Sequence, residues 1–234
     1  MYPIAILAGG LATRLRPITE KIPKALVEIA GEPFIFHQLR YLKGQNIQRI
    51  ILCVGYLGEM IQSVVGNGML FDLEVVYSFD GNKLLGTGGA LKHALPWLGD
   101  SFFVLYGDSF LPIDFVDVQS AYLRSGADCL MTVIKNADKW DKSNVVYKDG
   151  RILEYNKHKS HKDMKYIDYG LGILSASIFE TYDEHHTFDL AEIYESRSNN
   201  GGLAGYEVFK RFYEIGSPDG IRETEEYLSK NKWR

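Results

Sequence analysis

The chain has 234 residues, 46% hydrophobic and 24% charged, and its 26 basic and 30 acidic side chains leave a formal net charge of −4. This length fits one α/β domain, alone or with a small additional lobe, and the composition is that of an ordinary globular protein. A mildly acidic chain lacks the extended basic surface needed to bind nucleic acid or a membrane surface broadly, so we expect neither partner. The N-terminal residues lack the pattern of a signal peptide, and no apolar stretch has the length of a membrane span. We therefore expect a cytoplasmic protein, with Cys53 and Cys129 as buried thiols in strand-like runs.

Strands and helices alternate along the first part of the chain. Short apolar runs bounded by glycine or polar turns predict strands at 4–8, 49–55, 73–78, 102–108 and 129–134. Stretches with helical spacing of their apolar residues lie between them, at 34–45, 57–66, 88–98 and 116–126. This alternation predicts a mainly parallel sheet covered by helices on both faces. Ligands of such sheets bind beyond the carboxyl ends of the strands, so the loop at Gly9-Gly10 and the segment 106–109 should share one cleft.

The pattern becomes less regular from about residue 138. Residues 145–157 predict a hairpin that turns at Asp149-Gly150, and 166–179 returns to the sheet. We expect the region near 138–180 to form a lobe over the cleft, within a single domain that covers 1–234.

A helix-start signal stands near the C-terminal end of the sequence. Ser217 occupies the position of an N-cap, and Pro218 the first helical position that follows it. The predicted helix begins shortly after the carboxylate of Glu214, in the segment "YEIGSP".

The first loop collects groups that bind phosphate. After Gly9 and Gly10 come Thr13, Arg14 and Lys24, and the stretch 9–24 contains hardly any acidic residue. Glycines after a first strand let the backbone approach a phosphate, which the following amides and cations bind. The alternative is a tight turn with solvated arginines. The spacing is neither that of a P-loop nor the full dinucleotide fingerprint, which argues against an oxidoreductase.

Here the sequence resembles a known family. The stretch "LAGGLATRLRPITEKIPKALVEIAGEPFI" closely resembles the signature of sugar-1-phosphate nucleotidyltransferases, usually written L-A-G-G-x-G-T-R-x-x-P-x-T…P-K-P-L. The resemblance continues in the family's order through "LLGTGGAL" (84–91, base segment), "LYGDSF" (105–110, metal-binding strand end), "ILEYNK" (152–157, sugar site), "YIDYGLGIL" (166–174) and "FYEIGSPDGI" (212–221, closing metal motif). It implies a Rossmann-like, three-layer α/β nucleotidyltransferase fold with a mixed, mainly parallel sheet and a small sugar-binding lobe. No hexapeptide repeat follows, so we expect no left-handed β-helix.

Five positions depart from the family pattern. Ala12 stands where the family usually has glycine, which implies that this position needs no positive φ or that the loop is slightly shifted, and Ala25 stands where proline is common. Asn156 replaces a common glutamate, Asp168 a common asparagine or threonine, and Glu214 a common aspartate. The last three bear on the identity of the sugar and on the geometry of the metal site.

The resemblance implies that an NTP and a sugar 1-phosphate give an NDP-sugar and pyrophosphate. Two anions must meet, so charge neutralisation and alignment should dominate catalysis. The catalytic residues so implied are Arg14, on the leaving pyrophosphate, Lys24, near the α-phosphate, and Asp108. Nucleotide contacts are expected from Leu7, Ala8, Gly9, Gly10, Thr13, Arg14, Lys24, Gly86, Thr87 and Gly88. Substrate contacts are expected from Ser109, Asn144, Asn156, Lys157, Asp168 and Gly170.

Two carboxylates are the candidate metal ligands. Asp108 alone, after an apolar strand, could be a turn or capping residue. Paired with Glu214, it would form a site for Mg²⁺, or for Mn²⁺ in its place, because these cations take oxygen ligands and bridge phosphates. Glu214 could instead cap or salt-bridge the last helix. The six histidines suggest no zinc hydrolase, since His185 and His186 are adjacent.

Within the family, the short chain and "LGTGGAL" look most like heptose-1-phosphate or mannose-1-phosphate guanylyltransferases. Uridylyl, thymidylyl and cytidylyl transfer stay open, as does a catalytically silent nucleotide- or sugar-binding subunit on the same fold. The expected partners are an NTP and a sugar 1-phosphate, and a homodimer is a candidate assembly.

Overall fold

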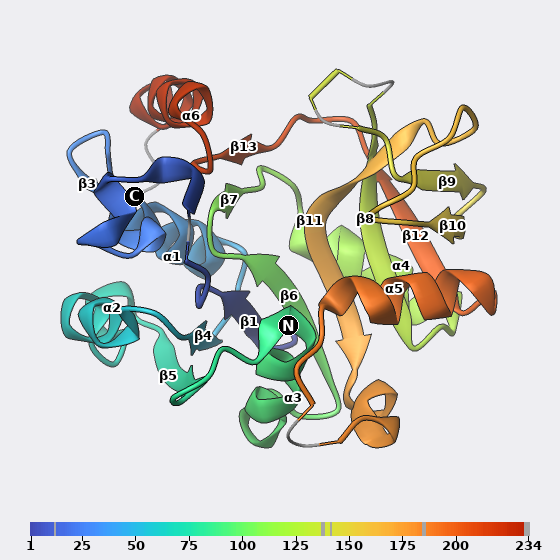
Figure 1. The fold of residues 1–234 in the computed structure, drawn as a ribbon, viewed down its shortest axis with the longest axis horizontal. Helices are drawn as coiled ribbons and strands as arrows, with labels where there is room; N and C mark the ends of the chain where they lie inside the picture. The colour runs from blue at the N-terminus through green and yellow to red at the C-terminus, as the bar shows by residue number, and fades with distance from the viewer. Residues whose placement is uncertain (12, 137–138, 141, 184–185, 232–234) are drawn as a thin grey trace.

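The structure is a computed structural model that describes residues 1–11, 13–136, 139–140, 142–183 and 186–231. Ala12, one of the departures from the family signature, lies outside the described residues. A mixed sheet of nine strands, in the order β5-β4-β1-β6-β11-β8-β12-β10-β9, forms the frame of the described part (Figure 1). Its strands are β1 (Ile4–Leu7), β4 (Arg49–Val54), β5 (Glu74–Phe79), β6 (Ser101–Tyr106), β8 (Cys129–Lys135), β9 (Val145–Lys148), β10 (Arg151–Tyr155), β11 (Tyr166–Ser175) and β12 (Leu203–Val208).

The two halves of the sheet differ in strand direction. Strands β5, β4, β1 and β6 are all parallel, so their carboxyl ends meet at one edge. Strand β11 is antiparallel to both β6 and β8, and β8 is parallel to β12. The β9–β10 hairpin continues the sheet beyond β12 in antiparallel fashion. Strands β9, β10 and β11, from the region 138–180, thus belong to the same sheet as the parallel half.

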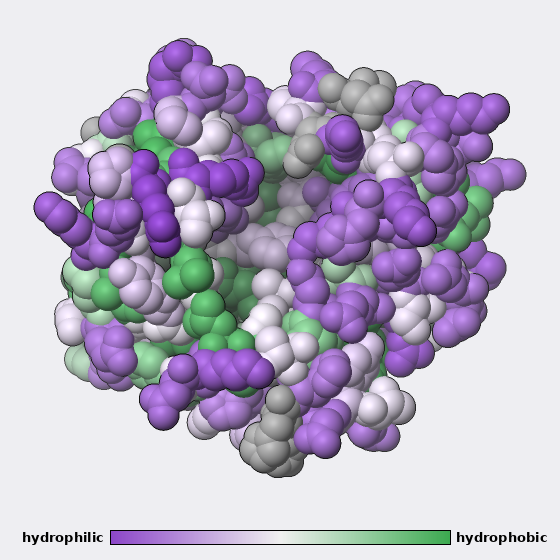
Figure 2. Space-filling view, in the orientation of Figure 1, coloured by the Kyte–Doolittle hydropathy of each residue, from purple (hydrophilic) through white to green (hydrophobic). Residues whose placement is uncertain are grey.

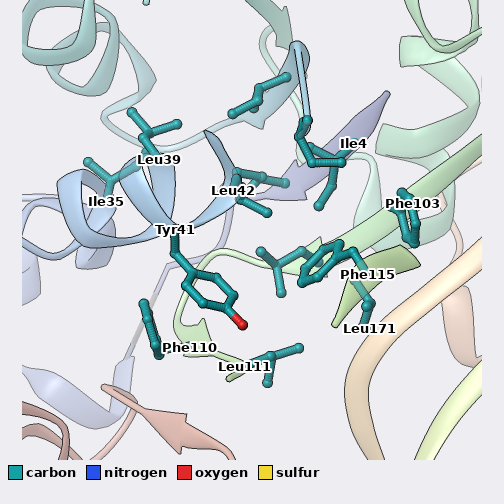
Figure 3. Close-up of a cluster of buried hydrophobic side chains, with 14 of the residues drawn as sticks. Ile4, Ile35, Leu39, Tyr41, Leu42, Phe103, Phe110, Leu111, Phe115 and Leu171 are labelled. Carbon is teal, nitrogen blue, oxygen red and sulfur yellow. The ribbon is translucent and has the colours of Figure 1, made fainter. Parts of the chain in front are cut away.

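Helices cover both faces of the sheet, which confirms the predicted α/β layering. Side chains alternate along each strand, so Ile4 and Ile6 of β1 lie in one buried cluster and Ala5 in the other. The first cluster takes residues from α1 (Phe34–Gly44), α2 (Gly58–Val65), α4 (Phe115–Ser125) and α6 (Pro218–Lys230). The second takes residues from α3 (Gly86–Leu98) and α5 (Leu190–Asn199). Figure 3 shows part of the first cluster, where the Tyr41 ring lies 4.9 Å from that of Phe110.

The strands and helices predicted from apolar runs form, with shifted ends. The strand predicted at 102–108 ends at Tyr106, because Gly107 and Asp108 turn away. The helix predicted at 88–98 begins at Gly86, so most of the predicted base segment 84–91 lies in the first part of this helix. The hairpin turns at Asp149 and Gly150 with φ of 47° and 81°, as a primed turn requires.

Two further predictions are confirmed, and several elements were not anticipated. Ser217 caps α6, since its hydroxyl accepts the Gly220 amide at 3.0 Å, and both cysteines are free and buried. Strand β12, helix α5 and the pairs β2 (Glu28–Ile29) with β3 (Glu32–Pro33) and β7 (Ser109–Phe110) with β13 (Tyr213–Glu214) were missed. Among the described residues, no helix combines the length and the apolar character needed to cross a membrane.

Candidate active site

A cavity of about 260 Å³ opens at the edge where the four parallel strands end. Figure 2 shows a hollow in this face, with pale and apolar residues inside and hydrophilic residues around its rim. Because β5, β4, β1 and β6 are parallel neighbours, the segments that follow them converge there. The cavity is lined by Leu7, Ala8, Gly9, Gly10, Lys24, Ala25, Cys53, Asp80, Leu84, Gly86, Thr87, Ala90, Tyr106, Gly107 and Asp108.

Two glycines let the strand ends pack closely under the cavity. A Cβ on Gly9 would lie 3.0 Å from the amide nitrogen of Gly55, and one on Gly107 only 2.8 Å from the carbonyl oxygen of Leu7. The Gly107 amide donates to that same carbonyl at 3.0 Å. Gly10 has no such neighbour among the described residues, since none of their atoms, its two chain neighbours apart, lies within 4 Å of its Cβ position. The predicted glycine loop therefore lines the cavity, and of its two glycines Gly9 is the one at which a side chain would be crowded by described backbone.

The three predicted catalytic side chains come from separate segments and meet at this edge. The Lys24 ammonium lies 2.9 Å from Asp108 Oδ2, with the two side chains 17% and 29% exposed. Arg14 is exposed in the 3₁₀ turn Thr13–Leu15. Arg14 Nη2 and Lys24 Nζ each lie 3.3 Å from the position that a Cβ on Gly216 would take, which brings both cations next to the segment that carries Glu214.

The short ladder between β7 and β13 places the second predicted metal ligand beside the first. Glu214 pairs with Ser109 in this ladder, and the amide of Ile215 donates to the Asp108 carbonyl at 3.0 Å. The Glu214 carboxylate accepts hydrogen bonds from the Gly216 amide and from the Ser217 hydroxyl, the latter at 2.7 Å. Glu214 thus binds the N-cap residue of α6 and the residue before it, whereas the helix amide itself is capped by Ser217.

The donor set of these two carboxylates fits a hard divalent cation. Asp108 contributes an oxygen at the cavity, and Glu214 lies across the ladder from its neighbour Ser109. In the described part of the chain, no group of three or more His, Cys, Asp or Glu side chains is arranged to hold a metal. Mg²⁺ commonly takes one or two carboxylates together with substrate phosphates and water, so two protein ligands suffice.

Asp80 is a cavity residue that sequence reasoning missed. It directly follows β5, as Asp108 follows shortly after β6, so the position at a strand end could have indicated it. Its Oδ2 accepts the Leu85 amide at 3.2 Å. Burial raises the pKa of Asp80, against the lowering effects of the Leu85 amide and of His93.

The glycines of the predicted base segment have two different surroundings. Gly86 and Thr87 line the cavity, and Gly86 has a φ of +75° that favours glycine. A Cβ on Gly88 would collide with the ring of Phe188, whose carbonyl accepts the Gly88 amide at 3.0 Å. Gly88 therefore lets α3 pack against the segment before α5, a role that the sequence did not indicate.

Asp189 joins the predicted nucleotide and sugar groups, and sequence reasoning missed it too. Its Oδ1 accepts the Thr87 hydroxyl at 3.0 Å, and its Oδ2 lies 2.5 Å from the Lys157 ammonium. Asp189 is the N-cap of α5 in a capping box with Glu192, a D-x-x-E signal that is visible in the sequence. Burial raises the pKa of Asp189, but the hydrogen bonds from Lys157, Ala191 and Thr87 outweigh it and leave the pKa lowered.

On the other side of β6, the start of β11 carries two predicted sugar residues. Asp168 is half-buried, and its Oδ1 accepts the Gly170 amide at 2.9 Å. Burial raises the pKa of Asp168 to about 6, although the Gly170 amide and Lys157 act in the opposite direction. Gly170 has a φ of +106°, and its Cβ position lies 3.7 Å from the ring of Tyr106, which itself lines the cavity.

The remaining predicted substrate residues lie in two places. The side-chain amide of Asn156 donates to the Glu195 carboxylate at 3.0 Å, and the backbone amide of Asn156 donates to the backbone carbonyl of Asn144 at 3.0 Å. The side-chain oxygen of Asn144 is buried and has no hydrogen-bond partner among the described residues. Ser109 instead stays with the metal ligands, since its hydroxyl donates to Asp108 at 3.2 Å.

Comparison with known proteins identifies the family. The model of the family described as nucleotidyl transferase matches residues 4–229. The chain belongs to the nucleotidyl transferase family. This match, with relatives that are sugar-1-phosphate transferases by name, confirms the recognition of a sugar-1-phosphate nucleotidyltransferase made from the signature stretch.

The similar proteins include two named guanylyltransferases. The D-glycero-alpha-D-manno-heptose 1-phosphate guanylyltransferase of Campylobacter jejuni is 30% identical over 215 residues, which are 92% of this chain and 94% of the relative. The mannose-1-phosphate guanyltransferase of Schizosaccharomyces pombe is 28% identical, over 96% of this chain and 64% of that one. The solved structure of HddC from Yersinia pseudotuberculosis complexed with GMP-PN is 28% identical, with a TM-score of 0.80, and the match covers 97% of this chain and 100% of that chain.

Proposed function

We propose that this enzyme transfers the guanylyl group of GTP to a heptose or mannose 1-phosphate and releases pyrophosphate. The observation that carries the proposal is one cavity with Asp80 at its β5 side and with Lys24 and Asp108 at its β6 side. Three inter-strand spacings separate these sides, about 14 Å along the edge of the sheet. A nucleoside triphosphate laid across the strand ends would place its base at Asp80 and its phosphates at Lys24. The names of the similar guanylyltransferases support the base and the two sugars.

Asp80 gives a hydrogen-bond reason for guanine. The Watson–Crick edge of guanine presents two adjacent donors, and a carboxylate accepts two parallel hydrogen bonds as it does from arginine. Uracil and thymine present one donor at the corresponding place. Asp80 Oδ1 makes no hydrogen bond to another residue in the described part of the chain, so it is open to accept from a base beside Gly86 and Thr87.

The proposed reaction is an in-line attack of a sugar-phosphate oxygen on the α-phosphorus, with pyrophosphate as the leaving group. Lys157 would hold the phosphate of the sugar, and Lys24 and Arg14 would stabilise the charge that develops on the α-phosphate and on pyrophosphate. No covalent intermediate with the protein is needed, because alignment and charge neutralisation carry the reaction. Asp108 and Glu214 would hold Mg²⁺, which when bound neutralises phosphate charge.

We also propose that the enzyme acts in the cytoplasm. Two free, buried thiols fit a reducing compartment.

A pyrophosphate-release screen of four NTPs against a panel of sugar 1-phosphates tests the proposal. We expect GTP with heptose or mannose 1-phosphate to give the highest kcat/KM, and Asp80→Asn to lower kcat/KM for GTP at least about tenfold, as for one lost charged hydrogen bond. Asp72→Asn is the matched control, since this aspartate has a side chain that is 91% exposed. Faster turnover of UTP or dTTP would refute guanylyl transfer, and no turnover with any pair would indicate a silent binding subunit.

A further inference from the structure

Gln38 is a polar side chain in the buried face of helix α1. It is 2% exposed, and its helical neighbours Ile35, Leu39 and Leu42 are apolar and buried. A buried amide group needs hydrogen bonds to offset the loss of water, so an apolar residue would be the simpler choice at this position. Gln38 belongs neither to the glycine loop nor to the sugar-site segment, so substrate contacts by these segments do not explain a buried glutamine at this position.

The Gln38 side chain binds the turn that carries Asp108 at two points. Its Nε2 donates to the Tyr106 carbonyl at 3.2 Å and to the Ser109 carbonyl at 2.8 Å. These two carbonyls flank Gly107 and Asp108. The Gln38 oxygen has no hydrogen-bond partner among the described residues, and turning the amide over gives no improvement because both neighbours are carbonyl acceptors. The residue thus keeps an unsatisfied acceptor while it makes these two bonds.

The same turn is held from two other sides. The Gly107 amide donates to Leu7 of β1, and the Asp108 carbonyl accepts the Ile215 amide, each at 3.0 Å. Ser109, whose carbonyl Gln38 binds, pairs with Glu214 in the β7–β13 ladder. A loss of the Gln38 bonds would therefore loosen the backbone of Asp108 directly and that of Glu214 through the ladder.

We propose that Gln38 is a positioning residue for the active site: it fixes the turn 106–109 and thereby the direction of the Asp108 carboxylate at the cavity. Two hydrogen bonds from one buried group span the turn, so the backbone at Asp108 is held by contacts separate from the ion pair between its side chain and Lys24. That the fixed carboxylate serves metal binding and nucleotidyl transfer rests on the proposed function.

The test compares Gln38→Met, which keeps the length of the side chain and removes both donors, with Tyr41→Phe. Tyr41 lies on the same helix (Figure 3). Its hydroxyl donates to the Ile113 carbonyl at 2.7 Å, outside the turn. We measure hydrogen exchange of the amides from 107 to 110, Mn²⁺ affinity by water proton relaxation, and steady-state kinetics. For Gln38→Met we expect at least tenfold faster exchange in the turn, a tenfold higher Kd for Mn²⁺, and a tenfold lower kcat with KM for GTP within threefold. Tyr41→Phe should change none of these by more than twofold.

Equal exchange rates in the turn for the two variants would overturn the positioning role. Faster exchange with an unchanged Mn²⁺ affinity would restrict the role to the backbone and overturn its link to the carboxylate. If Gln38→Met does not fold, Gln38→Asn, which is one methylene shorter and reaches one carbonyl at most, should show an intermediate effect on exchange. A wild-type enzyme that turns over no NTP would count against the proposed function only, since the exchange rates still judge Gln38.

Discussion

Asp168 is one of the carboxylates of the site. We expect the negative charge of Asp168 to lower the stability of the fold more than the charge of the other carboxylates there. Its pKa lies at about 6 in the folded protein against an ordinary value of 3.8, because burial disfavours the charged form. An acid whose pKa rises on folding holds more protons in the folded state, so its ionisation destabilises the fold as the pH rises through this interval. At about 1.4 kcal/mol per pH unit, the difference corresponds to about 3 kcal/mol. Since Asp168 keeps some contact with solvent, we expect about 2 kcal/mol.

Asp168→Asn keeps an oxygen that can accept the Gly170 amide and removes the charge. It should raise the free energy of unfolding by about 2 kcal/mol at pH 8, or Tm by about 4–8 °C, and by less than about 1 kcal/mol at pH 4.5. Urea unfolding of both proteins at several pH values measures this, with the exposed Asp149→Asn as control. A stability difference that is the same at pH 4.5 and pH 8 would refute the reasoning. A stabilised variant with a higher KM for sugar 1-phosphate would show that the carboxylate is kept for substrate at the expense of stability.

Other side chains give predictions of a different kind. Arg14→Ala should lower kcat at least a hundredfold, about 3 kcal/mol, with an unchanged Tm because the side chain is exposed, and near wild-type kcat/KM would remove Arg14 from the mechanism. Lys157→Ala should weaken sugar 1-phosphate binding in calorimetry and leave NTP affinity within a few fold; the opposite pattern would overturn its assignment. Gly88→Ala should destabilise the protein by about 1–3 kcal/mol in thermal unfolding, because the added methyl group meets the Phe188 ring. An unchanged Tm would mean that α3 can shift freely against α5.

The parallel half of the sheet could be predicted from the sequence because its signals are local. Each buried strand is a short apolar run, and the rule that parallel strands end at one edge predicted that the Gly9-Gly10 loop and the segment 106–109 share one cleft, where Gly9 and Asp108 both line the cavity. The same rule, applied to the end of β5, would also have selected Asp80. Asp80 lies outside the motifs that carry the family resemblance, so those motifs did not indicate it.

Contacts between distant segments could not be predicted in this way. The bond between Thr87 and Asp189 joins residues 102 positions apart, and those of Gln38 to the Asp108 turn span 68 and 71 positions. No periodicity encodes such pairs. Strand β12 was missed for a local reason, since Gly205 interrupts its apolar pattern to make room for the Tyr147 ring.

Asp108 and Asp189 each form an ion pair with a lysine. Their other hydrogen bonds explain why Asp108, and not Asp189, is proposed as a metal ligand. Lys24 is paired with Asp108 and Lys157 with Asp189, so phosphate oxygens that take over these lysines would leave both carboxylates without their cation. Asp189 would still accept from the Thr87 hydroxyl at 3.0 Å and the Ala191 amide at 2.9 Å, as the cap of α5. Within the described part of the chain, Asp108 would keep a single side-chain donor, the neighbouring Ser109 hydroxyl at 3.2 Å. Of the two lysine partners, Asp108 is therefore the one that needs a new cation, at a site that receives several phosphate charges.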